Sequence, residues 1–185
     1  MRKMVIALTA MLVLSIAAFA YAQAAQVNTY EVEASTNPTK AGSKSNPTPI
    51  SLTFNYTVGE QNNNRPAVIK KYSIRFAGIR VNPSAAAVCP AATLEREGPS
   101  GCPSKSIVGT GFIENETGAT NNPADKSIEC NAALSVVNHG SLRASIYVAG
   151  DPNQTDPRRR CAIQLASAIP AKFINRSSGE SSLDF

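Results

Sequence analysis

Residues 50–58 alternate without exception between apolar and polar side chains. The apolar members are Ile50, Leu52, Phe54, Tyr56 and Val58, and the polar members between them are Ser51, Thr53, Asn55 and Thr57. Successive side chains of a β-strand point to opposite faces of its sheet, so a two-residue period predicts a half-buried strand. A β-sheet is therefore the framework that this chain must build.

The rest of the chain shows the same preference. Beyond residue 22 it contains 21 Ile and Val but 6 Leu, and β-branched side chains suit a pleated surface. The same alternation recurs at residues 30–34 and 72–76. After residue 76 the alternation shifts by one position at Ala77-Gly78 and resumes at Ile79 and Val81, which predicts a β-bulge. Further strands are predicted over residues 106–113, 127–137, 142–148 and 160–169.

Turn signals complete the fold prediction. Asn138-His139-Gly140 is short enough for a hairpin turn with Gly140 at positive φ. One helix is expected over residues 90–97, with Pro90 in its first turn and Gly98 as its stop. Short strands with regular turns predict an all-β chain, an antiparallel β-sandwich (immunoglobulin-like or related) with one short helix in a disulfide loop.

The N-terminus has the layout of a secretory signal peptide. Arg2-Lys3 precedes an apolar run over residues 4–19, and small residues follow at Ala20 and Ala22. The run is shorter than a membrane-spanning helix needs. We expect cleavage after Ala22 or, as the second choice, after Ala24. Residues 1–22 are then the signal peptide, and residues 23–185 are one secreted domain without a transmembrane segment.

The remaining 163 residues carry 16 Lys and Arg against 13 Asp and Glu, a net charge of +3. So weak a charge argues against a nucleic-acid binder, and the length argues against a multidomain enzyme.

The four cysteines predict two disulfides in an exported chain. Cys89 and Cys102 flank the predicted helix, whereas Cys130 and Cys161 lie in phase with core-facing residues of two strands. The simplest pairing joins Cys89 to Cys102 and Cys130 to Cys161. In the alternative, the thiols of Cys130 and Cys161 stay free in the core. No C-x-x-C pair is present, which argues against a zinc site.

One segment resembles a known family. Its residues are Cys89-Pro90, Leu94, Gly98-Pro99, Cys102-Pro103, Ser106 and Val108-Gly109-Thr110-Gly111. They resemble a family of uncharacterised secreted actinobacterial β-rich proteins, over about a quarter of the exported chain. The resemblance implies export and a β-rich fold, with the first cysteine pair as a family feature and the second as a variable one. It implies no activity.

Catalytic, cofactor and metal sites are not indicated. His139 is the only histidine and is expected in a turn. Val108-Gly109-Thr110-Gly111 lies within a predicted strand, so it does not cradle a phosphate. The glutamate pairs at positions 31 and 33, 95 and 97, and 114 and 116 are expected to face solvent. Arg158, Arg159 and Arg160 either dock an anionic polymer or form a solvated loop end.

These observations favour a non-catalytic secreted or envelope-associated β-domain with a binding or structural role. Its partner would be a cell-wall or anionic polysaccharide. The alternatives are an exported enzyme with an unrecognised site, or a protease inhibitor presenting the Cys89–Cys102 loop.

The last residues, Leu183-Asp184-Phe185, alternate again. They predict either a short closing edge strand or a strand that a longer chain would continue.

Overall fold

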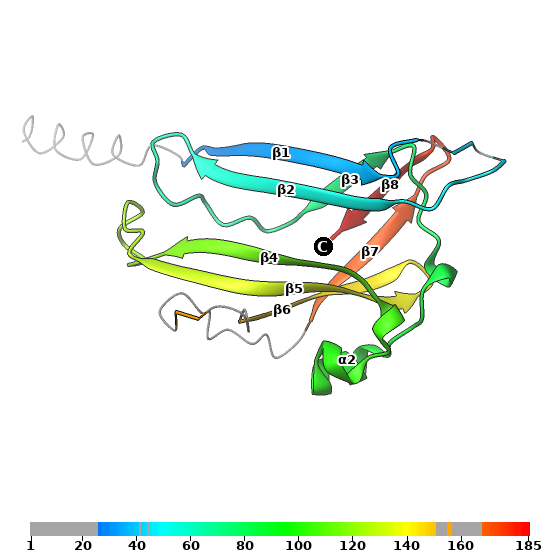
Figure 1. The fold of residues 1–185 in the computed structure, drawn as a ribbon. Coiled ribbons are helices and arrows are strands. Elements are labelled where there is room, and N and C mark those ends of the chain that lie inside the picture. The colour runs from blue at the N-terminus through cyan, green and yellow to red at the C-terminus, as the bar shows by residue number, and fades with distance from the viewer. Residues whose placement is uncertain (1–25, 41, 44, 151–154, 157–167) are drawn as a thin grey trace, which may run out of the picture. The chain divides into compact units, whose positions relative to one another are not determined.

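The computed structural model describes residues 26–40, 42–43, 45–150, 155–156 and 168–185 (Figure 1). These residues form antiparallel sheets, three single turns of 3-10 helix and one short α-helix, in two compact units that divide between Ala67 and Val68. The predicted class, all-β and antiparallel with one short helix in a disulfide loop, is confirmed. None of the helices described here is long and apolar enough to span a membrane.

The first unit is a β-hairpin. β1 (Asn28–Asn37) pairs antiparallel with β2 (Ser51–Glu60) in an unbroken register of ten residue pairs. Residues that face each other across the pair share a face, so the alternation in both strands yields one apolar face and one polar face. The apolar face pairs Tyr30 with Val58, Val32 with Tyr56 and Ala34 with Phe54.

Glu60 organises the turn that follows β2. Its buried carboxylate accepts hydrogen bonds from the backbone N–H groups of Asn62, at 2.8 Å, and Asn64, at 3.1 Å. Burial is the largest single influence and raises the pKa of Glu60. The hydrogen bonds from Asn64, Asn62 and the backbone of Val27 together outweigh it and lower the pKa below its ordinary value.

Glu60→Gln should therefore loosen this turn at neutral pH. Because folding lowers the pKa, the ionised carboxylate stabilises the turn above the pKa of the unfolded chain, and this stabilisation is lost as the pH falls through the folded-state pKa. Backbone amides of Asn62 and Asn64 should exchange hydrogen several-fold faster in the variant near pH 7. The difference should vanish at acid pH, with the exposed Glu31→Gln as control. A difference that persists at acid pH would contradict this role.

The second unit is a six-stranded antiparallel sheet with the strand order β3-β8-β7-β6-β5-β4. The strands are β3 (Ser73–Ala77), β4 (Ile107–Thr117), β5 (Ile128–Gly140), β6 (Arg143–Gly150), β7 (Ile169–Asn175) and β8 (Glu180–Asp184). β3 and β4 follow each other in the chain but form opposite edges of the sheet. Residues 78–106, which include α2 (Ala91–Glu97), therefore cross from one edge to the other (Figure 1).

Both faces of this sheet are buried at its centre. Ile146 belongs to one core cluster, with Ala144, Ala171 and Leu183. The next residue, Tyr147, belongs to a second cluster, with Val137, Ala168, Cys89 and Leu94 of α2. Adjacent strand residues point to opposite faces, so α2 and its loop cover the face opposite the first cluster.

Two local predictions were wrong. No bulge follows Ala77: β3 ends there, and Gly78 turns the chain at φ 70°. The hairpin turn is formed by Ser141 and Leu142, both at positive φ, as a two-residue turn of this kind requires. Gly140 does have positive φ, as predicted, but it lies with His139 at the end of β5.

The C-terminal strands also differ from expectation. Most of the predicted strand 160–169 lies outside the described residues, and β7, which begins at Ile169, was not predicted beyond that residue. The closing segment does form a strand, β8, but it lies inside the sheet between β3 and β7 and is not an edge. Phe185 continues its pairing through two backbone hydrogen bonds with Tyr72.

Candidate functional site

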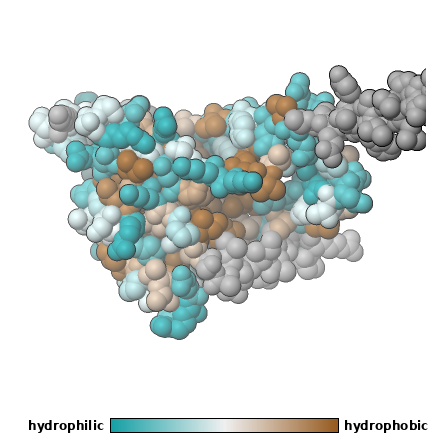
Figure 2. Space-filling model, turned by 180° about the vertical axis from the view of Figure 1, so that it is seen from behind, coloured by the Kyte–Doolittle hydropathy of each residue, from teal (hydrophilic) through white to brown (hydrophobic). Residues whose placement is uncertain are grey.

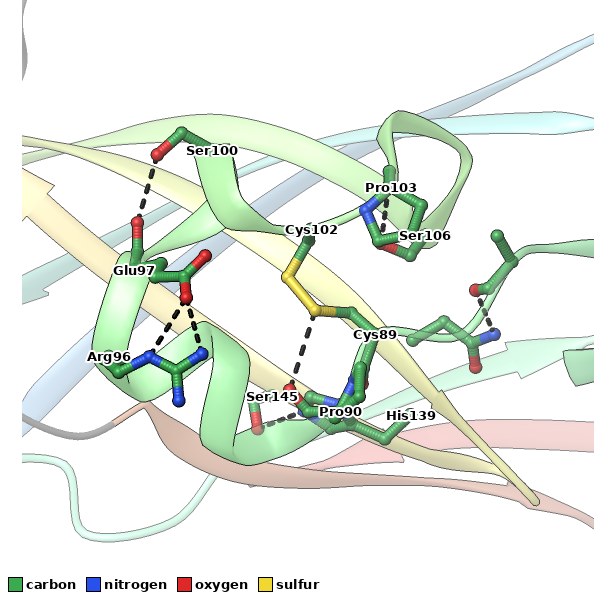
Figure 3. The surroundings of a disulfide bond; sticks show 12 residues. Cys89, Pro90, Arg96, Glu97, Ser100, Cys102, Pro103, Ser106, His139 and Ser145 are labelled. Carbon is green, nitrogen blue, oxygen red and sulfur yellow. Dashed lines mark hydrogen bonds and ion pairs between the residues drawn. A yellow bond between two sulfur atoms is a disulfide. The ribbon is translucent and has the colours of Figure 1, made fainter.

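The candidate site lies where residues 78–106, here called the crossover, pack on the six-stranded sheet. The Cys89–Cys102 disulfide, with its Cα atoms 5.4 Å apart, closes a loop that contains α2 and a single turn of 3-10 helix (Figure 3). This confirms the predicted pair. Cys89 itself is fully buried.

Several residues of the segment that resembles a known family pack the disulfide loop against the sheet. Leu94 is fully buried against Val137 and Tyr147 of the sheet. Gly98 ends α2 at φ 67°, and a Cβ at this position would lie 3.2 Å from the hydroxyl oxygen of Tyr147. The positive φ favours glycine there, and a side chain would also require Tyr147 to shift by a few tenths of an ångström.

Ser106 and Gly109, near the end of the same segment, also have structural roles. Ser106 is fully buried, and its hydroxyl donates to the carbonyl oxygen of Pro103 at 2.6 Å. A Cβ at Gly109 in β4 would lie 3.2 Å from Val136 on β5. These residues of the segment that carries the resemblance therefore pack the loop and β4 against the rest of the sheet.

His139 links this loop to the sheet. Its Nδ1 lies 2.6 Å from the carbonyl oxygen of Cys89, and its Nε2 lies 2.8 Å from the hydroxyl oxygen of Ser145 on β6 (Figure 3). A carbonyl oxygen only accepts, so Nδ1 carries a hydrogen and donates. In the neutral ring Nε2 then accepts from Ser145; in the charged ring it donates, and the hydroxyl accepts. The Ser145 hydroxyl can thus satisfy both forms of the ring.

Ser145 and His139 have the spacing of a nucleophile and its base, with the Cys89 carbonyl as the orienting group. Two observations favour a structural role instead. Ser145 is 7% exposed and lies in an interior strand, opposite Val137 on one side and Pro170 on the other. The orienting carbonyl also lacks the charge with which a carboxylate stabilises an imidazolium. The pair is best interpreted as a clamp on the crossover.

Asn138 forms a second clamp beside it. Its buried amide nitrogen donates to the carbonyl oxygens of Ala87, at 2.9 Å, and Pro83, at 3.2 Å. Its backbone carbonyl accepts from the N–H of Cys89 at 3.0 Å. The sequence placed Asn138 and His139 in a turn, and only their position at the end of a long strand brings them under the crossover.

The other end of the crossover is held in the same way. The side-chain amide of Asn175 exchanges two hydrogen bonds with the backbone of Val81, at 3.0 and 2.8 Å. Ser181, 1% exposed, donates to the carbonyl oxygen of Ile79 at 2.6 Å. Neither contact was predicted from the sequence, because the pattern of a strand does not reveal which polar residues will meet a distant loop.

The three glutamate pairs singled out from the sequence lie on different elements and are all exposed. Glu31 and Glu33 are exposed on the polar face of the hairpin, where they line a shallow depression of about 200 Å³ with Asn55 and Thr57. The remaining pairs are exposed too, one on α2 at positions 95 and 97 and one on β4 at positions 114 and 116. Among the described residues, no group of three metal-ligating side chains comes together.

Two predicted sites involve residues outside the described ranges. Arg158, Arg159 and Arg160 all lie there, so their predicted role stays a prediction. Cys130 is disulfide-bonded, whereas Cys161 lies outside the described residues, so the Cys130–Cys161 pairing also stays a prediction.

The apolar face of the hairpin carries several exposed large apolar side chains. Tyr30 is 63% exposed and Val32 66%, and their neighbours on β2, Phe54 and Tyr56, are 39% and 40% exposed. On the face of the molecule shown in Figure 2, hydrophobic residues, in brown, reach the surface in places among hydrophilic ones. An exposed apolar patch of this kind marks an interaction surface in soluble proteins.

Comparison with known protein families, with curated proteins and with solved structures finds no match to this chain.

Proposed function

We propose that this protein is an exported, non-catalytic β-domain that binds a cell-wall or other anionic polysaccharide of the cell envelope. The apolar face of the β1–β2 hairpin would be its contact surface. The observation that carries the proposal is the exposure of Tyr30, Val32, Phe54 and Tyr56 together on that face. The flat rings of Tyr and Phe offer apolar faces to a sugar ring, and the Tyr hydroxyls offer hydrogen bonds at their rims.

Export is supported by the sequence of residues 1–22 and by the disulfide chemistry of the chain, since structural disulfides persist in oxidising compartments. Arg158–Arg160 could add attraction to phosphate or sulfate groups of the same polymer, because the arginine fork matches such oxyanions.

The alternatives find less support. For an exported enzyme, the Ser145–His139 pair offers little support, because its serine is buried within the sheet. An inhibitor would have to present the Cys89–Cys102 loop, but that loop is helical and its Leu94 points into the core.

The test is sedimentation of the purified protein with insoluble cell-wall material. Tyr30→Thr/Val32→Thr should reduce the bound fraction several-fold, because the variant removes the two most exposed apolar side chains of the face and keeps the strand propensity. The matched control is Val68→Thr, which removes an apolar side chain that is 87% exposed and lies outside the hairpin. It should bind like the unchanged protein.

A parallel variant with Arg158, Arg159 and Arg160 replaced by alanine separates the two contributions. If charge contributes, this variant binds more weakly and the loss shrinks at high salt.

Protein recovered from the medium should begin at Gln23 or Ala25. Absence of binding by the unchanged protein, or equal binding by the Tyr30/Val32 and Val68 variants, would refute the hairpin as the contact surface.

A further inference from the structure

Among the strands that the structure describes, four lie at sheet edges, β1, β2, β3 and β4. Edge strands expose backbone N–H and C=O groups, and soluble proteins protect them with charges, prolines, bulges or short length. β1 carries Glu31 and Glu33, β3 has five residues with Arg75 at its centre, and β4 has a register shift near Val108. β2 differs from all three. From Ser51 to Gly59 it contains no charged residue, no proline and no bulge.

We propose that β2 pairs, antiparallel and about a two-fold axis at Asn55, with β2 of a second copy of this chain. The result is a four-stranded sheet in the order β1-β2-β2-β1. In this register Asn55 lies opposite Asn55 of the second copy, and every other residue lies opposite the one equally far on the other side of Asn55.

The strand is complementary to itself in this register. Phe54 lies opposite Tyr56 of the second copy, which makes two aromatic cross-strand pairs by symmetry. Leu52 lies opposite Val58 on the same face, and Thr53 opposite Thr57 on the other face. Aromatic, aliphatic and threonine pairs of this kind each stabilise an antiparallel sheet, and no like charges meet. The apolar faces of the two hairpins also join into one continuous surface.

At β1 and at β3 the equivalent pairing about the strand centre would oppose like charges. Two copies of β1 about an axis at Val32 would place Glu31 opposite Glu33 twice, and like charges in direct opposition destabilise a sheet. Two copies of β3 about its centre would oppose Arg75 to itself. The distribution of charge thus disfavours this central pairing at β1 and β3 but not at β2.

The strand is also accessible. Its middle residues, Thr53 to Thr57, are all exposed, and its partner within the sheet is β1. A single strand pair buries less than a standard interface of about 1,600 Å², so a concentration-dependent dimer is expected rather than a permanent one.

Sedimentation velocity over a concentration series tests the proposal. The unchanged protein should shift from monomer to dimer as its concentration rises. Asn55→Lys places two lysines in opposition at the axis and should weaken dimerisation roughly tenfold or more. The control is Ser35→Lys, which adds the same charge to the same polar face but on β1, opposite Thr53; its dimerisation should stay within about twofold of the unchanged protein.

Cross-linking tests the register. Asn55→Cys should form a disulfide-linked dimer under mild oxidation, because directly opposed residues bring their Cβ atoms within disulfide reach. Thr53→Cys and Thr57→Cys should each cross-link poorly alone but should cross-link to each other when mixed. A protein that stays monomeric at its highest soluble concentration overturns the proposal. So does a dimer that Asn55→Lys leaves intact, or one in which Thr57→Cys cross-links with itself as readily as Asn55→Cys.

Discussion

Replacing Cys89 and Cys102 together by alanine should lower the free energy of unfolding of the six-stranded unit by about 3 kcal/mol. The bridge joins residues 13 positions apart, and a cross-link over such a length stabilises mainly by restricting the unfolded chain. Alanine is the suitable replacement because Cys89 is fully buried and a serine there would bury a hydroxyl group.

Urea denaturation measures this loss. Addition of a reductant to both proteins should abolish their difference, since every other disulfide is common to the two. A loss below about 1 kcal/mol with an unchanged denaturant dependence would show that the Asn138 and His139 clamps hold the loop without the bridge.

Leu94→Ala should cost about 3 kcal/mol, a loss comparable to that of the disulfide. Leu94 is the one fully buried side chain of α2 in the core cluster that joins the helix to Val137 and Tyr147. Truncating it removes apolar contact and leaves a cavity that the disulfide-closed loop cannot easily collapse to fill.

Glu95→Ala is the control, because it changes the next residue of the same helix at an exposed position. It should alter the free energy of unfolding by no more than about 0.5 kcal/mol. Equal losses in the two variants would mean that the helix contributes through its own stability and not through packing on the sheet.

The strands could be predicted because their signal is local. Alternation over residues 50–58 led directly to β2, and the same period led to part of β1 and to β3; the strands predicted over residues 106–113, 127–137 and 142–148 cover most of β4, β5 and β6. The loop disulfide was predictable because Cys89 and Cys102 are close in sequence and flank a short helix with a recognisable start and stop. In both cases neighbouring residues carry the whole pattern.

The functional surfaces could be predicted only in part. The apolar and polar residues of the hairpin were assigned to faces from the sequence, but their exposure was not, because exposure depends on what else packs there. His139 was placed in a turn, because the segment Asn138-His139-Gly140 is short and Gly140 can adopt positive φ. The structure instead extends β5 through it and places the turn at Ser141 and Leu142.

By itself the sequence determined the β framework, the position of the one helix and the closure of its loop, since each follows from periodicity or from residues a few positions apart. The tertiary structure decided the strand order, which places β3 and β4 at opposite edges and β8 in the interior. It also decided that Asn138, His139, Asn175 and Ser181 bind the crossover between those edges. These contacts join residues about 50 to 100 positions apart. A polar side chain in a strand has the same local pattern whether it meets water or a distant backbone, so only the folded arrangement distinguishes the two.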